Sequence, residues 1–533
     1  MAWKGKRGDK EAFGGGCKMI FWADKLADEV IKREERLKRV KNLRVESGIG
    51  ASGIPHLGSA SDVARGWAVC LGIRDRGYDS DLIAFSDDRD GLRKVPLGFP
   101  ESLKEYIGKP VSHIPDPFGC HESYGEHMSS LLLESLEKLG IDFKFYSGDR
   151  FYAKGELDRE IGLALKEAER IKKVVEDWLG QDLRTVFFPI CQSCGRIYTT
   201  RVTGWEPGKV FYVCDQEFEG KVSGKPFMVK GCGYQGECSF RDGKLAWKVE
   251  FAARWSRLKV CSEAYGKDLA DSVRVNDWVS KNVFGWEPPL HARYELFLQK
   301  GGKKISKSVG NAITPQDWLR CGSPQSLNLL FFKRFTGTRE IDLNSVPAYM
   351  DEVDWLEDVY FGREKIQNER ELQHPKRLFE YIHYLKPPKK PGIHLPYLML
   401  ANILRMVPDL ELAKKIVMEL KGLDETEELE KRLRWAKNWV GERKAERPEI
   451  KPEELPALSE LAEWLEKERD AEEIQGKVFE LARKHGLKPS EFFQKLYLIL
   501  LGSPYGPRMG KLIQLLGCKR VAEKLRESGP AGI

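Results

Sequence analysis

A glycine-rich turn between a short apolar strand and an apolar helix constrains this chain more than any other segment. Residues 42–47 (NLRVES) predict a strand, 48–53 a tight turn and 55–71 a helix. Further strands and helices continue the alternation, at 81–86, 122–139 and 143–146. Strands that alternate with helices indicate an α/β fold with a parallel sheet covered on both faces.

The turn has the G-x-G-x-x-G spacing of a dinucleotide-binding loop, at Gly48, Gly50 and Gly53. Such a loop is followed about 20 residues later by an acidic residue that binds the ribose. The nearest candidates, Asp87 and Asp88, come about 35 residues later. The glycines alone are therefore a weak indication of NAD binding.

Two polar motifs about 250 residues apart indicate a nucleotide site instead. His56 and Gly58 stand at the start of the predicted helix, where backbone N–H groups and an imidazole can bind a phosphate. Lys304 and Lys307 offer two ammonium groups that can stabilise charge while phosphorus is attacked. Singly, each motif could be an ordinary loop. Together they predict an ATP site made of His56, Gly58, Ser59, Lys304, Ser306, Lys307 and Ser308.

A cysteine-rich segment interrupts the α/β pattern. Cys191 and Cys194 form a C-x-x-C pair, which supplies two ligands of a tetrahedral metal site. Cys214 and Cys232 are the preferred remaining ligands, and Cys238 is the alternative. The spacing predicts one structural Zn²⁺ with no open coordination position.

Composition places the chain among soluble, multidomain proteins, with 41% hydrophobic and 32% charged residues over 533 positions. The net charge of +7 is compatible with a polyanionic partner but does not establish one. No membrane span is expected, because no run approaches 18 apolar residues. Eleven cysteines without a secretory signal indicate reduced thiols and a cytoplasmic location.

Both motifs, in this order, resemble the HIGH and KMSKS signatures of class I aminoacyl-tRNA synthetases. Longer stretches are similar to the class I lysyl-tRNA synthetases: FSDDRDGLRKVP (85–96), IPDPFGCHESYGEHM (114–128), FAARWSRLK (251–259), GKDLADSV (266–273), YELFLQKGGKKISKSVGN (294–311), GSPQSL (322–327) and GPRMGKLIQLLG (506–517). The resemblance extends from about residue 21 to the C-terminus and is densest in the first 330 residues or so.

The resemblance implies a Rossmann-type catalytic domain with an inserted zinc module and a C-terminal all-α anticodon-binding domain. It implies lysine activation with ATP and Mg²⁺, transfer to tRNA(Lys), and a monomer as the favoured state. The expected parts are a flexible tail (1–18), the first catalytic half (19–186), the zinc insertion (187–247), the second catalytic half (248–345) and the helical domain (346–533).

The same resemblance places Gly48, Trp247 and Tyr294 in the L-lysine pocket. Indole and phenol rings suit the stem and the ammonium group of lysine through packing and cation–π attraction. The acidic candidates for the ε-ammonium are Glu46, Asp87 and Asp88.

The chain departs from the family pattern at several positions. Ser59 ends the first motif, and Ile305 replaces the methionine of the second. Gly50-Ala51 stands where many members have Thr-Pro, and Leu269 stands where many have His, so those two lysine contacts are missing.

Three alternatives remain to be weighed. A glutamyl-type synthetase would be expected to carry an arginine near the first motif, and residues 48–56 have none. A non-catalytic RNA-binding protein would not need Lys304 and Lys307. His121 and His127 are six positions apart, so they do not share a helix face as the H-E-x-x-H motif of zinc proteases requires. We expect a substrate-pocket or packing role for that segment.

Overall fold

The computed structural model describes residues 21–295, 297–298, 313–337, 339–366, 368–442 and 450–528. A parallel sheet forms the centre of the molecule, with strand order β13-β12-β1-β2-β4. Its strands are β1 (Leu43–Ile49), β2 (Ser80–Ser86), β4 (Lys144–Ser147), β12 (Val260–Gly266) and β13 (Leu290–Tyr294). The predicted α/β architecture is confirmed.

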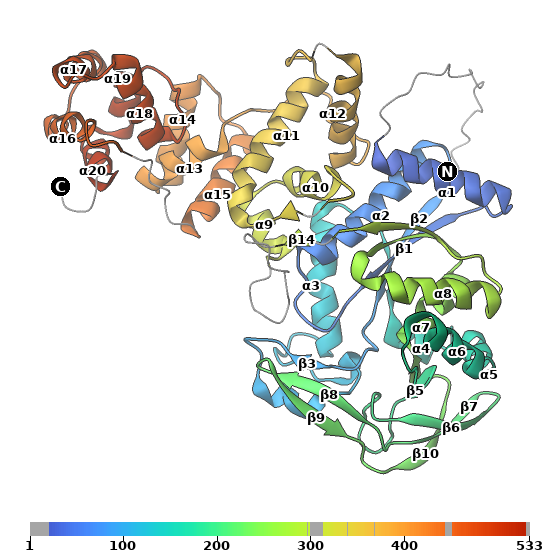
Figure 1. Ribbon diagram of the computed structural model, residues 1–533. Coiled ribbons are helices and arrows are strands. Elements are labelled where there is room, and N and C mark those ends of the chain that lie inside the picture. The colour runs from blue at the N-terminus through green and yellow to red at the C-terminus, as the bar shows by residue number, and fades with distance from the viewer. Residues whose placement is uncertain are drawn as a thin grey trace.

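Helices cover both faces of the sheet (Figure 1). Val45 and Leu82 belong to the core that includes α2 (Leu57–Asp75), whereas Ile83 and Phe85 belong to a second core with α7 (Trp247–Leu258). Successive strand residues point to opposite faces, so neighbouring apolar residues can contribute to two separate cores. This explains why the strands read as continuous apolar runs.

The strand order reverses beside β1. The chain passes outward from β1 to β2 and β4, and then returns to form β12 and β13 on the other side of β1. The carboxyl ends of β1 and β12 therefore lie at a topological switch point, the usual ligand-binding crevice of an open α/β sheet.

The cysteine-rich segment folds into small sheets below the central sheet in Figure 1. Its strands are β5 (Phe187–Pro189), β6 (Arg201–Glu206), β7 (Lys209–Val213), β8 (Glu217–Val222), β9 (Lys225–Lys230), β10 (Gln235–Ser239) and β11 (Gly243–Leu245). The strand β3 (Lys94–Val95), which follows β2 in the chain, pairs with β8. This pairing attaches the segment to the loop that follows β2.

The last third of the chain is helical, as predicted. Beyond Val346 the elements of the described residues are α11 (Val346–Tyr360), α12 (Glu369–Ile382), α13 (Tyr397–Met406), α14 (Leu410–Lys421), α15 (Glu427–Gly441), α16 (Leu455–Trp464), α17 (Ala471–Lys484), α18 (Pro489–Leu501), α19 (Met509–Leu516) and α20 (Cys518–Ser528). From α13 onward they extend to one side of the sheet (Figure 1). The exact domain boundaries stay predictions.

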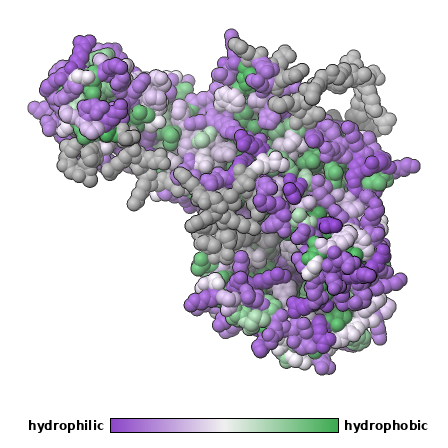
Figure 2. All heavy atoms as spheres, in the orientation of Figure 1, coloured by the Kyte–Doolittle hydropathy of each residue, from purple (hydrophilic) through white to green (hydrophobic). Residues whose placement is uncertain are grey.

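The face of the molecule in Figure 2 is mostly hydrophilic, with hydrophobic residues in small, scattered groups. Within the described part of the chain, no helix combines the length and the apolar character that crossing a membrane requires.

A buried carboxylate joins the first helix of the described chain to the helical half. Asp24, on α1 (Trp22–Arg36), accepts hydrogen bonds from Arg377 at 2.8 and 2.9 Å, from Tyr381 at 2.8 Å and from Arg76 at 3.1 Å. Burial alone would raise the pKa of Asp24. The hydrogen bonds from Arg377, Tyr381 and Arg76, together with the charge of Arg377, outweigh burial and lower this pKa below its usual value. The interaction therefore stabilises the fold while Asp24 is ionised.

We expect Asp24→Asn to lower the free energy of unfolding at pH 7 by about 2–3 kcal/mol, because two arginines lose a buried anionic partner. The folded-state pKa is depressed, so the stabilisation is present above about pH 4 and is lost as the pH falls through the folded pKa. Denaturant unfolding at several pH values measures both effects. Asp28→Asn, a more exposed partner of Arg76, is the control and should change stability by less than about 1 kcal/mol. Equal stability of Asp24→Asn and the unchanged protein at pH 7 would contradict this account.

Candidate active site

The first predicted motif lies at the amino end of α2, next to the switch point. His56 caps this helix, and its Nδ1 accepts a hydrogen bond from the Ser59 backbone N–H at 3.3 Å. In a neutral ring the proton is then on Nε2, which becomes the donor. A Cβ at Gly58 would lie 2.7 Å from His56 Cε1, so glycine is needed for the ring to fold over the helix start. The amino end of α2 and the His56 imidazole therefore lie side by side, an arrangement suited to binding an anion.

Four residues of the predicted ATP site lie outside the described residues: Lys304, Ser306, Lys307 and Ser308. The chain that follows them is described. The Ile313 carbonyl accepts a hydrogen bond from the Leu57 N–H at 3.0 Å, directly after His56. Thr314 then caps α9 (Pro315–Cys321) in a reciprocal capping box with Asp317. Ile313 and Thr314 therefore lie beside the start of α2.

A buried arginine contacts carboxylates near the carboxyl ends of β1 and β2. Arg254, on α7, is only 1% exposed; its Nε is 2.9 Å from Glu46 Oε1, and its Nη1 donates to Asp87 Oδ1 at 2.8 Å. A Cβ at Gly48 would make ordinary contacts with Arg254 Nη2 at 3.6 Å and Asp87 Oδ2 at 3.9 Å. Neither steric crowding nor a positive φ explains the glycine at this position, which leaves backbone open toward the crevice.

Negative charge exceeds positive charge around this arginine. Burial raises the pKa of Glu46 to about 8 and that of Asp87 to about 7, although the charge of Arg254 opposes both shifts. Asp90 and Glu250 add further negative charge next to Asp87. The buried wall of the crevice is therefore short of a cation.

Trp247 joins the same group of carboxylates. As the first residue of α7, it donates from Nε1 to both Asp90 oxygens, at 3.1 and 3.2 Å. The buried Lys244 ammonium lies 3.0 Å from Asp90 Oδ1 and also contacts Glu250. The structure thus brings Gly48 and Trp247 to one carboxylate wall, made of Asp87 and Asp90.

The remaining predicted pocket residues are placed differently. Tyr294 ends β13 and packs against α2, with its ring centroid 4.3 Å from the Arg65 guanidinium carbon. Asp88 lies at the start of α4 (Gly148–Ala153), where its Oδ1 accepts the Asp149 N–H at 2.7 Å. Asp88 is therefore committed to a helix start, whereas Asp87 borders the crevice.

The cysteines predicted as metal ligands come together. The sulfur atoms of Cys191, Cys194, Cys214 and Cys232 all lie within 4.8 Å of one another, and two of the pairs are 3.7 Å apart. Ligands about 2.3 Å from a tetrahedral zinc are about 3.8 Å from each other, so the cluster fits Zn²⁺. Cys238, the alternative, lies on β10 outside this group.

A second cluster was not predicted. The ligand atoms of Asp116, Cys120, His121 and His127 also lie within 4.8 Å of one another. Cys120 Sγ is 3.1 Å from His127 Nδ1 and 3.2 Å from His121 Nδ1. The Asp116 carboxylate accepts the backbone N–H groups of Cys120 and His121, at 2.9 and 3.0 Å. These bonds shape the loop so that its side chains converge.

The two histidines are too far apart in the sequence to share one helix face, and they meet in another way. His127 is on α3 (Tyr124–Leu139), but His121 precedes the helix, and a loop places them together. Mixed Asp, Cys and His side chains within 12 residues were the available signal, since these residue types bind zinc. A carboxylate, a thiol and two imidazoles can hold such a metal.

Comparisons with known proteins agree with this geometry. A family model described as tRNA synthetases class I (K) matches residues 20–384, and an anticodon binding domain model matches residues 427–528. A lysine–tRNA ligase of Cenarchaeum symbiosum is 44% identical, over 97% of this chain and 99% of the relative. A lysine–tRNA ligase of Natronomonas pharaonis is 32% identical, over 97% of this chain and 99% of the relative. A lysine–tRNA ligase of Thermococcus kodakarensis is 33% identical, over 96% of this chain and 100% of the relative.

A parallel sheet with a capped helix at its switch point is an architecture that many nucleotide-binding α/β proteins share. Because the family model covers more than half of the sequence and relatives match it over almost their full length, the chain belongs to the class I tRNA synthetase (K) family.

Proposed function

We propose that the protein is an enzyme that activates L-lysine with ATP and transfers it to tRNA(Lys), as a cytoplasmic monomer. One observation carries the proposal. At the switch point, the amino end of a helix capped by His56 occurs together with a carboxylate wall that is short of a cation. Family membership and the names of the relatives support the same reaction.

In the proposed reaction the lysine carboxylate attacks the α-phosphorus of ATP, which forms lysyl-adenylate and releases pyrophosphate. His56 and the N–H groups near Gly58 and Ser59 bind the phosphate side of the nucleotide. Lys304 and Lys307 neutralise the charge that develops on the departing pyrophosphate. Mg²⁺ arrives with ATP and supplies further charge neutralisation. A ribose hydroxyl of tRNA then attacks the acyl carbon, and AMP leaves.

The lysine side chain is proposed to lie between Gly48 and Trp247, with its ammonium group at Asp87 and Asp90. The bare Gly48 backbone makes room for the stem, and Trp247 is itself oriented by Asp90. A lysine ammonium supplies the cation that the wall lacks, whereas a glutamate side chain would add another anion. Tyr294 is assigned to the opposite, α2 side of the crevice.

Charging assays test the function directly. With ATP and tRNA, the protein should esterify tRNA with lysine and with none of the other standard amino acids. Lys307→Ala should lower adenylate formation by about a hundredfold or more while lysine binding changes little, because the ammonium acts on charge of the transition state. Lys281→Ala, at the exposed end of α8 (Ala270–Asn282), is the control. Charging with a different amino acid, or a fully active Lys307→Ala variant, would refute the proposal. The resemblance also implies that exchange of pyrophosphate into ATP needs tRNA.

The pH dependence of lysine affinity tests the ammonium site. Burial raises the pKa of Asp87 to about 7 in the free protein. The negative charges of Asp90 and Glu250 also raise it, whereas the positive charge of Arg254 lowers it. An ionised Asp87 attracts the ammonium, which stays protonated far above pH 8, so affinity should rise from pH 6 to pH 8.

Calorimetric titration with L-lysine measures this rise. Asp87→Asn should weaken binding about tenfold or more at pH 8 and flatten the profile. Asp88→Asn keeps the acceptor for the Asp149 N–H and should keep the slope. An unchanged affinity of Asp87→Asn would show that the ammonium binds elsewhere.

We also propose that each of the two ligand clusters holds a zinc ion. The thiols of Cys191, Cys194, Cys214 and Cys232 would form a closed structural site, and the cluster at Asp116 a second site. Zinc supplies structural crosslinks here, and no step of the proposed chemistry uses it.

Metal analysis of protein prepared without chelator should therefore find about two zinc ions per chain. Cys191→Ser should remove one and lower the unfolding temperature, because binding free energy is folding free energy at such sites. His127→Ala should remove the other. Cys238→Ser is the matched control, since this buried thiol lies outside both clusters. Full zinc content in Cys191→Ser, or no zinc in the unchanged protein, would contradict the assignment.

A further inference from the structure

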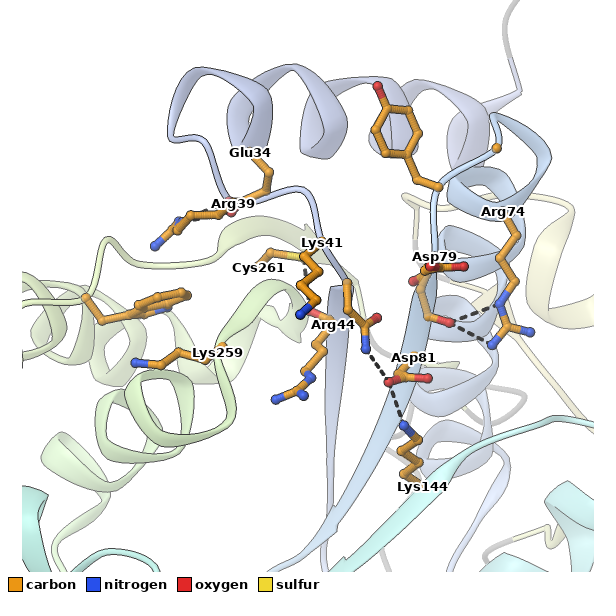
Figure 3. A pocket seen from close by; sticks show the side chains of 15 residues that line it. Glu34, Arg39, Lys41, Arg44, Arg74, Asp79, Asp81, Lys144, Lys259 and Cys261 are labelled. Atoms are coloured by element: carbon orange, nitrogen blue, oxygen red, sulfur yellow. Dashed lines mark hydrogen bonds and ion pairs between the residues drawn. The ribbon is translucent and has the colours of Figure 1, made fainter. Parts of the chain in front are cut away.

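A second hollow lies at the opposite edge of the central sheet, where the strands begin (Figure 3). Its volume is about 1040 Å³, the size of a small-molecule site. The lining residues at the amino ends of β1, β2, β4 and β12 are Asn42, Arg44, Ser80, Asp81, Lys144, Lys259 and Cys261. None of the residues placed in the proposed active site lines it.

Positive charge is in excess in this hollow. Its lining includes six cationic side chains, from Arg39, Lys41, Arg44, Arg74, Lys144 and Lys259, and only three carboxylates, from Glu34, Asp79 and Asp81. A concave, basic surface that lacks matching acids attracts anions.

The acids do not neutralise the cations evenly. Arg39 donates to both Glu34 oxygens, at 2.9 and 3.1 Å, and Lys144 lies 2.6 Å from Asp81 Oδ2. Arg74 lies 3.4 Å from Asp142 Oδ2. Of the six cations, the other three have no such partner: among the ion pairs of the described chain, none involves Lys41, Arg44 or Lys259. In Figure 3 Lys259 lies on the left and Lys41 and Arg44 lie near the middle, all three to the left of Asp79 and Asp81.

The three cations are held in different ways. Arg44 Nη1 donates to the Leu258 carbonyl at 2.7 Å, which fixes the guanidinium without neutralising its charge. The Lys259 ammonium lies 4.6 Å from the centroid of the Trp286 ring, over which Arg39 also lies, at 3.9 Å. The indole therefore keeps two cations close together in the hollow.

The backbone of Lys259 is in a conformation that favours glycine. Lys259 follows α7 with φ +59° and ψ +45°, the left-handed position at which helices commonly end in glycine. A lysine there gives up backbone stability, while its partly exposed side chain places an ammonium group over the Trp286 ring. Burial and the neighbouring Arg159, Arg257 and Arg39 also lower the pKa of Lys259, against the opposing charge of Glu160.

We infer that this hollow binds the phosphate groups of a small polyphosphate compound through Lys41, Arg44 and Lys259. Two ammonium groups act as point charges and a guanidinium binds phosphate oxygens in pairs. Three unpaired cations match a multiply charged anion, whereas a single carboxylate would leave two of them uncompensated. The volume accommodates several linked phosphates, and its concave shape favours a small molecule over the extended backbone of a nucleic acid.

Calorimetric titration of the full chain with inorganic tripolyphosphate tests this inference. The Lys304→Ala, Lys307→Ala double variant serves as the background, so that the proposed ATP site contributes little. In this background Lys41→Gln, Arg44→Gln and Lys259→Gln should each weaken binding about tenfold. Arg257→Gln, which removes a charge from the same helix end but whose guanidinium contacts Glu156 outside the hollow, should leave binding unchanged.

Lys259→Gly separates a binding role from a structural one. This variant should unfold at the same or a higher temperature, because glycine tolerates the left-handed backbone, and should still lose tripolyphosphate affinity. A lower unfolding temperature with unchanged affinity would assign the lysine a structural role and overturn the inference.

Two further outcomes would also overturn it. One is the absence of tripolyphosphate binding that depends on these three residues. The other is that binding of a single-stranded RNA 12-mer requires these three residues while binding of tripolyphosphate does not. That result would make the hollow a nucleic-acid contact. Lysine charging by Lys259→Gln in an otherwise unchanged chain should be normal, so failure of this inference is distinct from failure of the proposed enzyme activity.

Discussion

The buried Arg254 guanidinium holds the centre of this molecule together. It reaches from α7 across the sheet to Glu46 in β1 and to Asp87 after β2, so one side chain fixes three elements relative to one another. Removing it would leave two carboxylates in a nearly water-free environment, which is one of the most destabilising changes a core can undergo. Because α7 begins at Trp247, the same ion pairs also set where the indole meets Asp90. Core stability and the shape of the proposed lysine pocket thus depend on one interaction.

The two edges of the sheet have opposite electrostatic character. At the carboxyl edge, buried acids outnumber the two cations Arg254 and Lys244, and burial raises the pKa values of Glu46 and Asp87. At the amino edge, cations outnumber acids. A site that binds a cationic amino acid needs a negative electrostatic potential. The amino end of α2 at His56 carries the positive end of the helix dipole, which suits the phosphates of a nucleotide. In the proposed function, the carboxyl edge of the sheet receives both the lysine ammonium group and the phosphates of ATP.

Much of the central fold could be predicted from the sequence, because strand and helix periods and glycine turns are local properties. The strand predicted at 42–47 is β1, Leu43–Ile49, and the helix predicted at 55–71 is α2, Leu57–Asp75, shifted because His56 caps it. The C-x-x-C pair indicated where a metal cluster should be sought. Long-range pairings could not be predicted: nothing near Arg254 in the sequence indicates that it meets Glu46, 208 positions earlier. The Asp116 cluster was missed because a loop, and no regular period, brings its ligands together.

A crystal structure with a non-hydrolysable lysyl-adenylate analogue would test the central claim most directly. We predict that the lysyl ammonium lies within hydrogen-bond distance of Asp87 or Asp90, beside Trp247. The group that replaces the phosphate should face the first turn of α2 at His56. An analogue bound away from the switch point, or bound there with its ammonium directed away from both carboxylates, would contradict the account.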